Sequence, residues 1–481
     1  MSSGHPRVRV VVLNWNGGEH VMRCIKRLTC TDWPADRLEI VVLDNASTDG
    51  SDLAIAETFG ERVEVRPTGA NLGFVANNLA MADLAGTDFV ALVNNDAFVE
   101  PGWLAPLVYA LLADAGLGAA CPRILFAPAF HELRIESPVF VPPADGRALG
   151  VRIREVATQG RSVFHLSQFV SGAWGIEPDA DGRPFRWLGG EAVIRAAAVE
   201  RDEAAAFGFV DVELAAEATK QAVLCCGLYR NKVTVTPEWQ RFRIPCWQQP
   251  FDVVNNAGGV VIEDGFGADR GYLQVDGNRF DSPAEVFNWC GGGVLLRSRY
   301  LEHVGLLDER FFLYYEDTDL SWRGQAKGWR YLYVPDSVIL HLHAASSGEG
   351  SDTFQFFVER NRLMMLTKNA PARLALGSVV GSVTATLSYA RHDVLRPLLG
   401  RRRPPLRLIY NRSRSFASYL RWLPPMLVAR RRLRPGRTLT DADLSGRLTT
   451  RRDWNEDSDL VASGAGWSIP SAGDSRNQRP A

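Results

Sequence analysis

The feature that most constrains the fold is a regular alternation of short apolar runs with helix-like segments over the first 125 residues. Runs such as residues 40–43 and 89–93 are apolar throughout, which is typical of parallel strands that are covered on both faces by helices. The sequence therefore predicts an α/β domain with a mostly parallel sheet, and places functional side chains at the carboxyl ends of its strands. The predicted strands are residues 7–14, 39–44, 63–67 and 88–94, and the predicted helices are residues 21–29, 51–59 and 75–84.

A chain of 481 residues is too long for one hydrophobic core, so we expect several units. Short runs separated by turns predict a β-rich insertion, and the α/β pattern then returns to complete the first domain. A helical and strongly basic region follows, and the Ser-, Gly-, Asp- and Arg-rich end is typical of a disordered tail. The predicted boundaries are 1–125 for the first α/β half, 126–252 for the insertion, 253–370 for the second α/β half, 371–440 for the basic region and 441–481 for the tail.

Composition excludes some function classes. The chain is 46% hydrophobic with a formal net charge of -1, which indicates a globular protein without a general attraction to nucleic acid. Its seven cysteines are scattered and lack paired C-x-x-C spacing, which favours a reducing cytoplasm over a zinc site. No export signal is visible, and residues 374–389 are too short and too often interrupted by Gly, Ser and Thr to span a membrane. We expect a cytoplasmic protein.

The first chemical motif is an apolar strand that ends at Asp44 and is followed by a turn rich in capping residues. A carboxylate at a strand end can accept hydrogen bonds from a nucleobase or a ribose hydroxyl. The alternative is that Asp44 only stabilises the start of the next helix, together with Ser47, Thr48 or Asp49.

The second motif is Asn94, Asn95 and Asp96 at the end of another apolar strand. Asp96 can hold Mg²⁺ or Mn²⁺ between two phosphates, because these ions need few carboxylates when phosphate oxygens and water complete their coordination. Asn-Asn-Asp is also a common turn sequence after a strand, so the motif by itself leaves both interpretations open.

The third motif places Glu316, Asp317 and Asp319 among aromatic residues, at the predicted start of a helix. A general base must lie beside the acceptor hydroxyl in a partly desolvated place, where a carboxylate gains proton affinity. The alternative is that the acids only favour a helix N-terminus, although the surrounding aromatic residues are not needed for that role.

Taken together and in this order, the motifs resemble those of the family 2 glycosyltransferases of the GT-A fold, particularly their bacterial rhamnosyltransferase-like branch. The resemblance covers residues 7–125 and 253–370 and leaves out the insertion and the basic region. The matching segments are VVLNWNG at 11–17, DNASTDGS at 44–51, NLGF at 71–74, LVNND at 92–96, WCGGG at 289–293 and FLYYEDTDL at 312–320.

The resemblance implies roles for individual residues. Asp96 would bind the metal, although the family often has a second acid where this chain has Asn94. His341 would complete the metal or diphosphate site, with His343 as the competing candidate. The implied donor-site residues are Asn14, Asp44, Asn45, Asn71, Gly73, Asn94, Asn95 and Asp96.

On the acceptor side, the resemblance assigns Asp317 as the general base, Glu316 as its supporting neighbour, and Trp289, Gly291 and Gly292 as a wall. It implies an inverting transfer that uses Mg²⁺ or Mn²⁺ and a nucleotide-diphosphate sugar, with dTDP-rhamnose as the first candidate. The acceptor would be a glycan or a lipid-linked hydroxyl in cell-envelope polysaccharide synthesis.

Two regions outside the resemblance have open roles. In the insertion, four tryptophans could stack on sugar rings, fill a core or support self-association into a homo-oligomer. In the basic region, from Arg391 to Arg437, interleaved apolar residues favour an amphipathic surface on anionic lipid over nucleic-acid contact, and a solvated helix face is the open alternative. The four tryptophans are Trp174, Trp187, Trp239 and Trp247.

Two rival functions remain. A sugar-nucleotide pyrophosphorylase would carry a glycine-rich, Lys-bearing phosphate loop, and residues 10–20 contain none. A non-catalytic carbohydrate-binding protein built around the insertion would not need both Asp96 and Asp317.

Overall fold

The computed structural model describes residues 4–143, 146–198, 208–342, 351–395 and 406–459. His343 and the last part of the predicted tail lie outside them. The chain divides into two compact units. The first contains residues 1–125, 254–272 and 277–454, and the second contains residues 126–253, 273–276 and 455–481.

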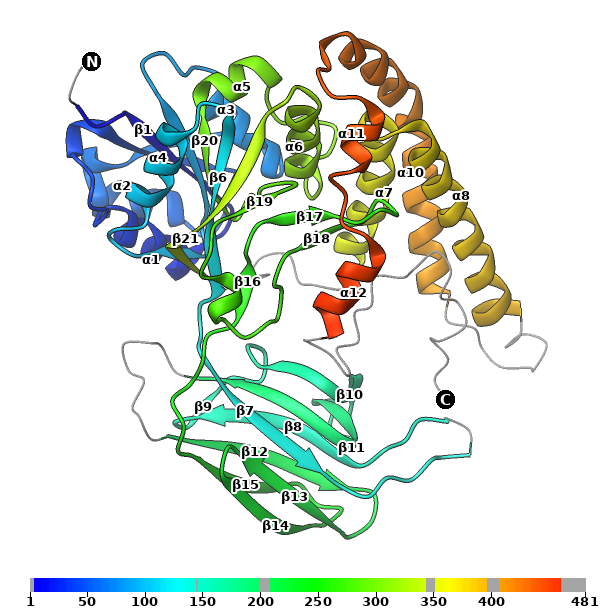
Figure 1. The fold of residues 1–481 in the computed structure, drawn as a ribbon. Helices are drawn as coiled ribbons and strands as arrows, with labels where there is room; N and C mark the ends of the chain where they lie inside the picture. Colours follow the sequence, from blue (N-terminus) through cyan, green and yellow to red (C-terminus); the bar gives the residue numbers. More distant parts are fainter. Residues whose placement is uncertain (1–3, 144–145, 199–207, 343–350, 396–405, 460–481) are drawn as a thin grey trace. The chain divides into compact units, whose positions relative to one another are not determined.

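The first unit is built on a ten-stranded sheet with the main order β19-β21-β6-β20-β4-β1-β2-β3 (Figure 1). β16 pairs with β6, and β5 pairs with β21. The strands are β1 (Val8–Asn14), β2 (Leu38–Asp44), β3 (Glu64–Pro67), β4 (Phe89–Asn94), β5 (Ala97–Val99), β6 (Leu117–Phe126), β16 (Val254–Asn256), β19 (Ala284–Val286), β20 (Gly293–Arg297) and β21 (Arg330–His341).

The sheet is parallel over β3-β2-β1-β4, where the apolar runs of the sequence predicted it. Beyond β4 it is mixed, because β20 pairs antiparallel with both β4 and β6. The α/β class is therefore confirmed, with a parallel part from the first 125 residues and an antiparallel part that is completed by strands from after the insertion.

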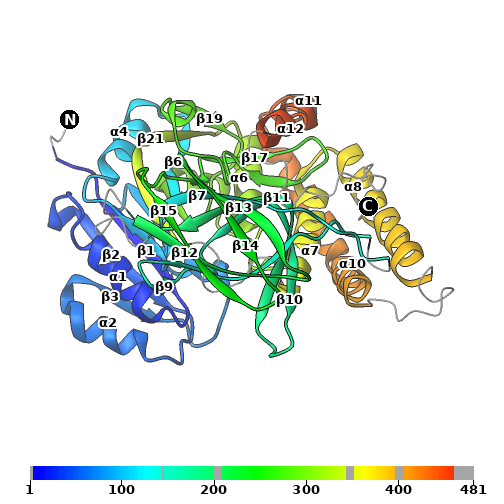
Figure 2. The same cartoon turned by 90° about the horizontal axis from the view of Figure 1, so that it is seen from below.

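Short helices connect these strands, and Figure 2 shows α1 and α2 beside β2 and β3. The predicted helix at 75–84 is shorter than expected, with a 3₁₀ turn at Phe74–Asn77 before α3. The helices are α1 (Gly18–Leu28), α2 (Ser51–Phe59), α3 (Asn78–Met81), α4 (Leu104–Ala113), α5 (Ser298–Val304) and α6 (Glu316–Ala326). A small antiparallel pair, β17 (Gly259–Val261) and β18 (Gly267–Asp269), lies in the same unit.

Long helices follow the sheet: α7 (Asp352–Asn369), α8 (Ala372–Tyr389) and α10 (Arg407–Leu433). Leu363, Met364 and Tyr419 are buried in a core that α7 and α10 share. Arg430, which the sequence placed on a lipid-facing surface, is instead buried and donates to the carbonyls of Thr367 and Ala370. Among the described residues, no helix is both long and apolar enough to cross a membrane.

The predicted tail is ordered over its described part, which corrects the expectation of disorder for residues 441–459. α11 (Asp441–Ser445) begins with a capping box, in which Thr440 and Asp443 each bond the other's backbone N–H. Leu444 is fully buried, and α12 (Arg451–Asp459) follows. Two reciprocal caps and one buried leucine give this polar segment enough contacts to remain folded.

The insertion is β-rich, as predicted. Its nine-stranded sheet has the main order β14-β13-β7-β11-β8-β12-β15, with β10 on β11 and β9 on β8. The strands are β7 (Phe130–Glu136), β8 (Val151–Thr158), β9 (Arg161–Ser162), β10 (Gln168–Pro178), β11 (Pro184–Ala197), β12 (Gly208–Ala216), β13 (Lys220–Cys226), β14 (Tyr229–Val235) and β15 (Gln240–Cys246).

The tryptophans of the insertion mostly serve packing. Trp187 is buried beside Leu149, and Trp174 and Trp239 are partly buried against the same cluster. Trp247 differs, since 55% of its surface is exposed. Three of the four tryptophans therefore pack within the insertion, and among the four only Trp247 has a mostly exposed side chain.

Candidate functional site

The strand ends that the sequence singled out meet at one edge of the sheet. Asn14 and Asp44 are direct neighbours at the ends of β1 and β2. Asn94, at the end of β4, is the neighbour of Leu13 in β1. Parallel pairing in this register is what brings three polar residues, far apart in sequence, to the same edge.

Asn14 organises the first part of this edge. Its fully buried side chain donates to Asp44 Oδ1 at 3.1 Å, to Ser51 Oγ at 2.8 Å and to Ser47 Oγ at 3.2 Å. Asp44 Oδ2 accepts from the Ser47 backbone N–H at 3.1 Å. The first turn of α2 is instead bonded by Asp49, whose Oδ1 accepts from the Ser51 backbone N–H, so Asp44 is not its cap.

A chain of amides continues from Asn45 towards Gly73. Asn45 Nδ2 donates to Asn71 Oδ1 at 3.0 Å, and Asn71 Oδ1 also accepts from the Gly73 N–H at 2.9 Å. Gly73 has φ +71°, and a Cβ there would lie 2.2 Å from the carbonyl oxygen of Phe312. Phe74 N–H donates to that same oxygen at 2.7 Å. Only glycine allows this loop to approach the segment before α6 so closely.

Asp96 and His341 form the second part of the edge. His341 Nε2 lies 3.0 Å from Asp96 Oδ1 and 3.4 Å from Asn94 Nδ2, and both Asp96 and His341 are only 6% exposed. His341 Nδ1 lies 3.1 Å from Asn255 Oδ1. In the tautomer of His341 whose Nδ1–H donates to Asn255 Oδ1, Nε2 carries no proton and its lone pair faces Asp96 Oδ1.

This pair fits a divalent cation. Neighbouring ligands of an octahedral ion at about 2.1 Å lie about 3.0 Å apart, which is the spacing of Oδ1 and Nε2 here. A hydrogen bond to the second ring nitrogen is also how proteins commonly orient a metal-binding histidine. Asp96 and His341 are therefore suitable metal ligands, with Asn255 as the residue that orients the imidazole.

Asp317 lies in the first turn of α6 and is partly buried. Oδ2 accepts from the Gly291 N–H at 3.2 Å, and Oδ1 accepts from the Thr318 N–H at 2.6 Å. Burial raises the pKa of Asp317 to about 6, against these hydrogen bonds, and the nearby Asp269 carboxylate adds to the increase. A carboxylate with this pKa is ionised at neutral pH and still basic enough to take a proton from a hydroxyl.

Glu316, beside it, is in a different state. Its side chain is 4% exposed, and its Oε2 has no hydrogen-bond partner among the described residues. Burial and then the charge of Asp317 raise the pKa of Glu316 well above its usual value, which favours the protonated form of this group.

The segment Gly291–Gly292 connects the two parts of the site. Gly291 N–H donates to Asp317, and the Gly292 carbonyl accepts from the Asn94 N–H at 3.2 Å. A Cβ on Gly292 would lie 3.6 Å from His341 Cε1. Asp317 and the Asp96–His341 pair are thus held on either side of one short turn.

Trp289 does not take the predicted place. Its side chain is fully buried, so it cannot present a face to an acceptor in this arrangement, and the wall predicted there is limited to Gly291 and Gly292. The ring of Trp289 is large and apolar, and it follows a buried segment, which favours the interior over the site edge.

Three non-glycine residues before α6 have left-handed backbone conformations: Phe312, Tyr314 and Tyr315, with φ between +67° and +68°. Such residues are strained and need support from their surroundings. Asn361 of α7 supplies it, since its Nδ2 lies 3.0, 2.8 and 2.8 Å from the carbonyls of Phe311, Leu313 and Tyr314.

Sequence reasoning missed Asn255, Asp269 and Asn361. Their neighbours in the sequence give no signal, and Asn361, for example, stands between two arginines, Arg360 and Arg362. His343, the competing metal candidate, lies outside the described residues.

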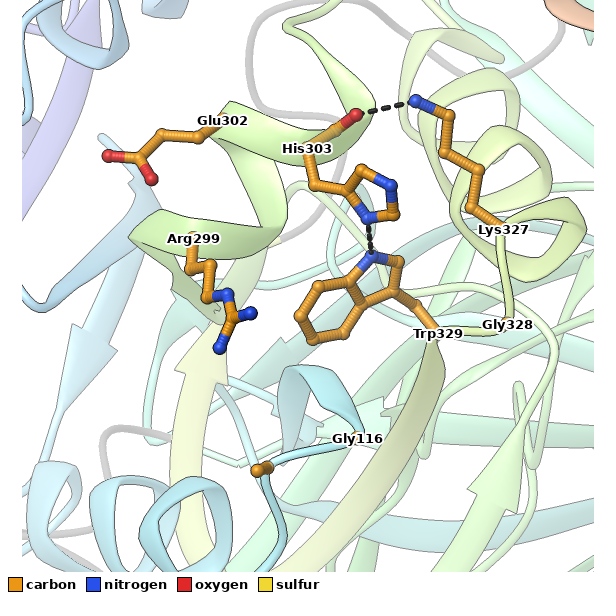
Figure 3. Close-up of a pocket in the computed structure, with 8 residues that line it drawn as sticks. Gly116, Arg299, Glu302, His303, Lys327, Gly328 and Trp329 are labelled. Atoms are coloured by element: carbon orange, nitrogen blue, oxygen red, sulfur yellow. Dashed lines mark hydrogen bonds between the residues drawn. The ribbon is translucent and has the colours of Figure 1, made fainter. Parts of the chain in front are cut away.

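A pocket of about 570 Å³ lies elsewhere in the first unit and is shown in Figure 3. Its residues include Gly116, Arg299 and Trp329, and the Trp329 Nε1–H donates to His303 Nδ1. Arg299 follows the end of β20 that pairs with the start of β4, at Phe89. The pocket is therefore at the opposite end of β4 from Asn94, and no predicted site residue lines it.

Known proteins resemble parts of this chain. Residues 9–140 match the family model described as Glycosyl transferase family 2. Two curated relatives are the N-acetylglucosaminyl-diphospho-decaprenol L-rhamnosyltransferases of Mycobacterium tuberculosis strains CDC 1551 / Oshkosh and ATCC 25618 / H37Rv. Each is 31% identical over 145 residues, which are 28% of this chain and 44% of the relative. The chain thus spans less than half the length of these relatives.

Solved structures show more distant similarity. GalNAc-T7 with UDP, GalNAc and Mn²⁺ is 12% identical with a TM-score of 0.42, over 76% of this chain and 48% of that one. The mannosyltransferase PcManGT from Pyrobaculum calidifontis, with GDP-Man and Mn²⁺, is 15% identical with a TM-score of 0.37, over 89% and 87%.

Proposed function

We propose that this chain is an inverting glycosyltransferase that uses a nucleotide-diphosphate sugar and a divalent cation, because residues 9–140 match the model of glycosyl transferase family 2. One observation carries the proposal. The turn Gly291–Gly292 is hydrogen-bonded to the Asp317 carboxylate on one side and to Asn94, the neighbour of His341, on the other, so a base and a candidate metal pair lie in one site.

The donor is held at the edge formed by β1, β2 and β4. Asp44 presents a buried carboxylate at a strand end, where it can accept hydrogen bonds from a nucleobase or ribose. The side-chain amide of Asn14 fixes the orientation of the Asp44 carboxylate by donating to its Oδ1. The hydrogen bond between Asn45 and Asn71 holds the loop that ends in Gly73, and this loop passes close to the donor. Asn95 lies at the same edge, with its Nδ2 3.5 Å from Asn14 Oδ1.

The cation, Mg²⁺ or Mn²⁺, would be held by Asp96 and His341, and when bound it neutralises charge on the leaving diphosphate. Asn255 keeps the imidazole of His341 in place through Nδ1. Asn94 replaces a second acid in this motif, so the protein supplies one negative charge to the ion.

Asp317 acts as the general base. Its two backbone hydrogen bonds keep the carboxylate in one orientation, and its pKa of about 6 lets it remove the proton from the attacking hydroxyl at neutral pH. The deprotonated hydroxyl then displaces the diphosphate from the opposite face of the sugar, which inverts the anomeric carbon. The raised pKa of Glu316 disfavours a second negative charge beside this base.

We propose dTDP-rhamnose as the first donor to test, and a glycan or lipid-linked hydroxyl of cell-envelope polysaccharide as the acceptor. The support is the activity for which the two relatives are named, since both are N-acetylglucosaminyl-diphospho-decaprenol L-rhamnosyltransferases. Their match covers 28% of this chain, so donor and acceptor both depend on direct measurement.

A lipid-linked acceptor also agrees with the surface of the C-terminal helices, which we propose lies on anionic membrane. α8 exposes Leu376, Val380, Val383 and Leu387 at spacings of 4, 3 and 4 residues, on one helical face. On α10, the exposed apolar residues Leu420, Leu427 and Val428 lie near exposed basic residues in the sequence. The basic residues are Arg421, Arg431 and Arg432. Neither helix contains Asp or Glu, so no acid opposes binding to anionic lipid.

Vesicle sedimentation tests this surface. The full chain should pellet with phosphatidylglycerol vesicles and remain in solution with phosphatidylcholine vesicles. Leu420→Asp combined with Leu427→Asp should abolish pelleting, whereas Leu112→Asp, at an exposed position of α4, should not. Equal pelleting of both variants would place the lipid contact elsewhere.

The transferase proposal is tested by binding and turnover of UDP-, dTDP- and GDP-sugars, with and without Mn²⁺ or Mg²⁺. Wild type and Asp317→Asn should bind the same donor with the same metal requirement, and only wild type should turn it over. The control is Asp36→Asn, because Asp36 is 77% exposed and precedes β2, at the far end from Asp44.

If no nucleotide sugar binds to any variant, the non-catalytic carbohydrate-binding rival is favoured, and the insertion with its exposed Trp247 becomes the place to test. If Asp317→Asn keeps full turnover, another group is the base.

A further inference from the structure

Three buried residues of the insertion lie together without a role in the transfer reaction. They are His131 on β7, Cys226 at the end of β13 and Cys246 at the end of β15, and their ligand atoms lie within 4.8 Å of one another. The two sulfur atoms are 2.7 Å apart. Both cysteines are almost completely buried, at 5% and 0% exposure.

The positions of these cysteines in the sheet give their contact a consequence. In the order of paired strands, β13 is second from one end, next to the edge strand β14, and β15 is the edge strand at the other end, so the two cysteines lie near opposite edges of one sheet. The sheet curls until these edges meet, and Figures 1 and 2 both show β15 beside β13 and β14. A bond between Cys226 and Cys246 would join the edges covalently.

We propose that Cys226 and Cys246 form a reversible disulfide that closes the sheet of the insertion. The alternative for such a cluster is a metal ion held with His131. Two thiolates on one tetrahedral zinc ion, each at about 2.3 Å, lie about 3.8 Å apart. The observed 2.7 Å is well below that distance and nearer to the roughly 2.05 Å of a disulfide bond, which favours the sulfur–sulfur bond.

The reaction needs an oxidant, and a small-molecule disulfide such as glutathione disulfide supplies it. The Cys226 thiolate attacks one glutathione sulfur, forming a mixed disulfide and releasing one reduced glutathione. The Cys246 thiolate then attacks the Cys226 sulfur and releases the second. Two protein thiols lose two hydrogens, and one glutathione disulfide becomes two glutathiones. Because the pair is buried, exchange proceeds when the strand ends open locally.

The environment assigns the order of these steps. The contact between the two sulfur atoms lowers the pKa of Cys226, while the same contact and burial raise the pKa of Cys246. Cys226 is therefore the first thiolate. Burial lowers the pKa of His131, so its imidazole is neutral at neutral pH.

Differential alkylation with mass spectrometry tests the proposal on the full wild-type chain. After treatment with glutathione disulfide, unfolding without reductant and alkylation, Cys226 and Cys246 should be found in one linked peptide pair, while Cys225 is alkylated. Cys225 is the matched control, since it is the next residue on β13 and its sulfur contacts Arg230 instead.

Thermal unfolding gives a second readout. The oxidised wild type should unfold at a higher temperature than the reduced protein, because the bond constrains the unfolded chain. This difference should vanish in Cys246→Ser and persist in Cys225→Ser. Alkylation of both Cys226 and Cys246 after oxidation would overturn the proposal. So would one zinc ion per chain that protects both thiols and is lost in His131→Ala, which would make the cluster a metal site.

Discussion

His341 Nε2 lies 3.0 Å from Asp96 Oδ1, although the two residues are 245 positions apart in the chain. The contact joins His341, the last residue of β21, to Asp96, which directly precedes β5. The two strands are also paired there through their backbones, since His341 of β21 is the partner of Ala97 of β5. An imidazole nitrogen and a carboxylate oxygen thus converge at the edge where β1, β2 and β4 end.

The first prediction concerns the metal. Asn255→Ala removes the acceptor that orients His341, so Mn²⁺ affinity in the presence of a nucleoside diphosphate should fall roughly tenfold to a hundredfold. His341→Ala should lower it further. Calorimetric titration measures both, with Asn231→Ala, at an exposed position of β14, as the control. Unchanged affinity in all three variants would mean that the ion binds elsewhere.

The second prediction concerns pH. Since the pKa of Asp317 is raised to about 6, the rate of transfer at low substrate should increase with pH up to about pH 6 and become constant above it. Asp317→Asn should lose about a hundredfold or more in this rate at pH 7.5. Initial rates between pH 4.5 and 8.5 measure the profile. A rate that does not vary with pH in wild type would exclude Asp317 as the titrating base.

The third prediction concerns stability. A carboxyl group with a raised folded pKa holds its proton more tightly in the folded state, so folding loses stability as pH rises from about 4 to 6. Asp317→Asn removes this loss and should increase the free energy of unfolding at pH 7.5 by about 1–3 kcal/mol. Urea denaturation at pH 7.5 and pH 4 tests it. The gain should be absent at pH 4, and a gain of equal size at both values would point to another cause.

The fourth prediction contrasts two buried acids of α6. The raised pKa of Glu316 favours its neutral form, so the neutral and nearly isosteric Glu316→Gln should change the free energy of unfolding by less than about 1 kcal/mol. Asp319 forms buried ion pairs with Arg323 and Lys368, so Asp319→Asn removes the carboxylate that Arg323 pairs with and one of the two that Lys368 pairs with, and should cost about 3–5 kcal/mol. Denaturation of both variants compares them directly, and equal losses would contradict a neutral Glu316.

The fifth prediction concerns Asn361. Asn361→Ala removes the donor shared by three carbonyls of the strained segment before α6, which should cost about 1–3 kcal/mol of stability. Because that segment positions Asp317, turnover should fall more than donor binding. Rates and donor affinities measured on the same sample separate the two effects. An equal fall in both would mean that Asn361 only supports the fold.

The sequence by itself determined the elements whose signals are local. Continuous apolar runs predicted β1, β2 and β4 and therefore the strand ends at Asn14, Asp44 and Asn94. Acids following aromatic residues predicted the start of α6 at Glu316, where the structure has it. Strand ends and helix starts depend on a few neighbouring side chains, so one segment contains all the information needed.

Tertiary structure alone decided which distant residues meet these elements. Asn255 and Asn361 act through partners 86 and roughly 50 positions away, and nothing in their own neighbourhood marks them. Trp289 is part of a motif that resembles a binding wall, yet packing placed its ring in the interior. Local pattern cannot settle such positions, because burial and hydrogen-bond partners depend on what other segments leave open once the sheet and helices have packed.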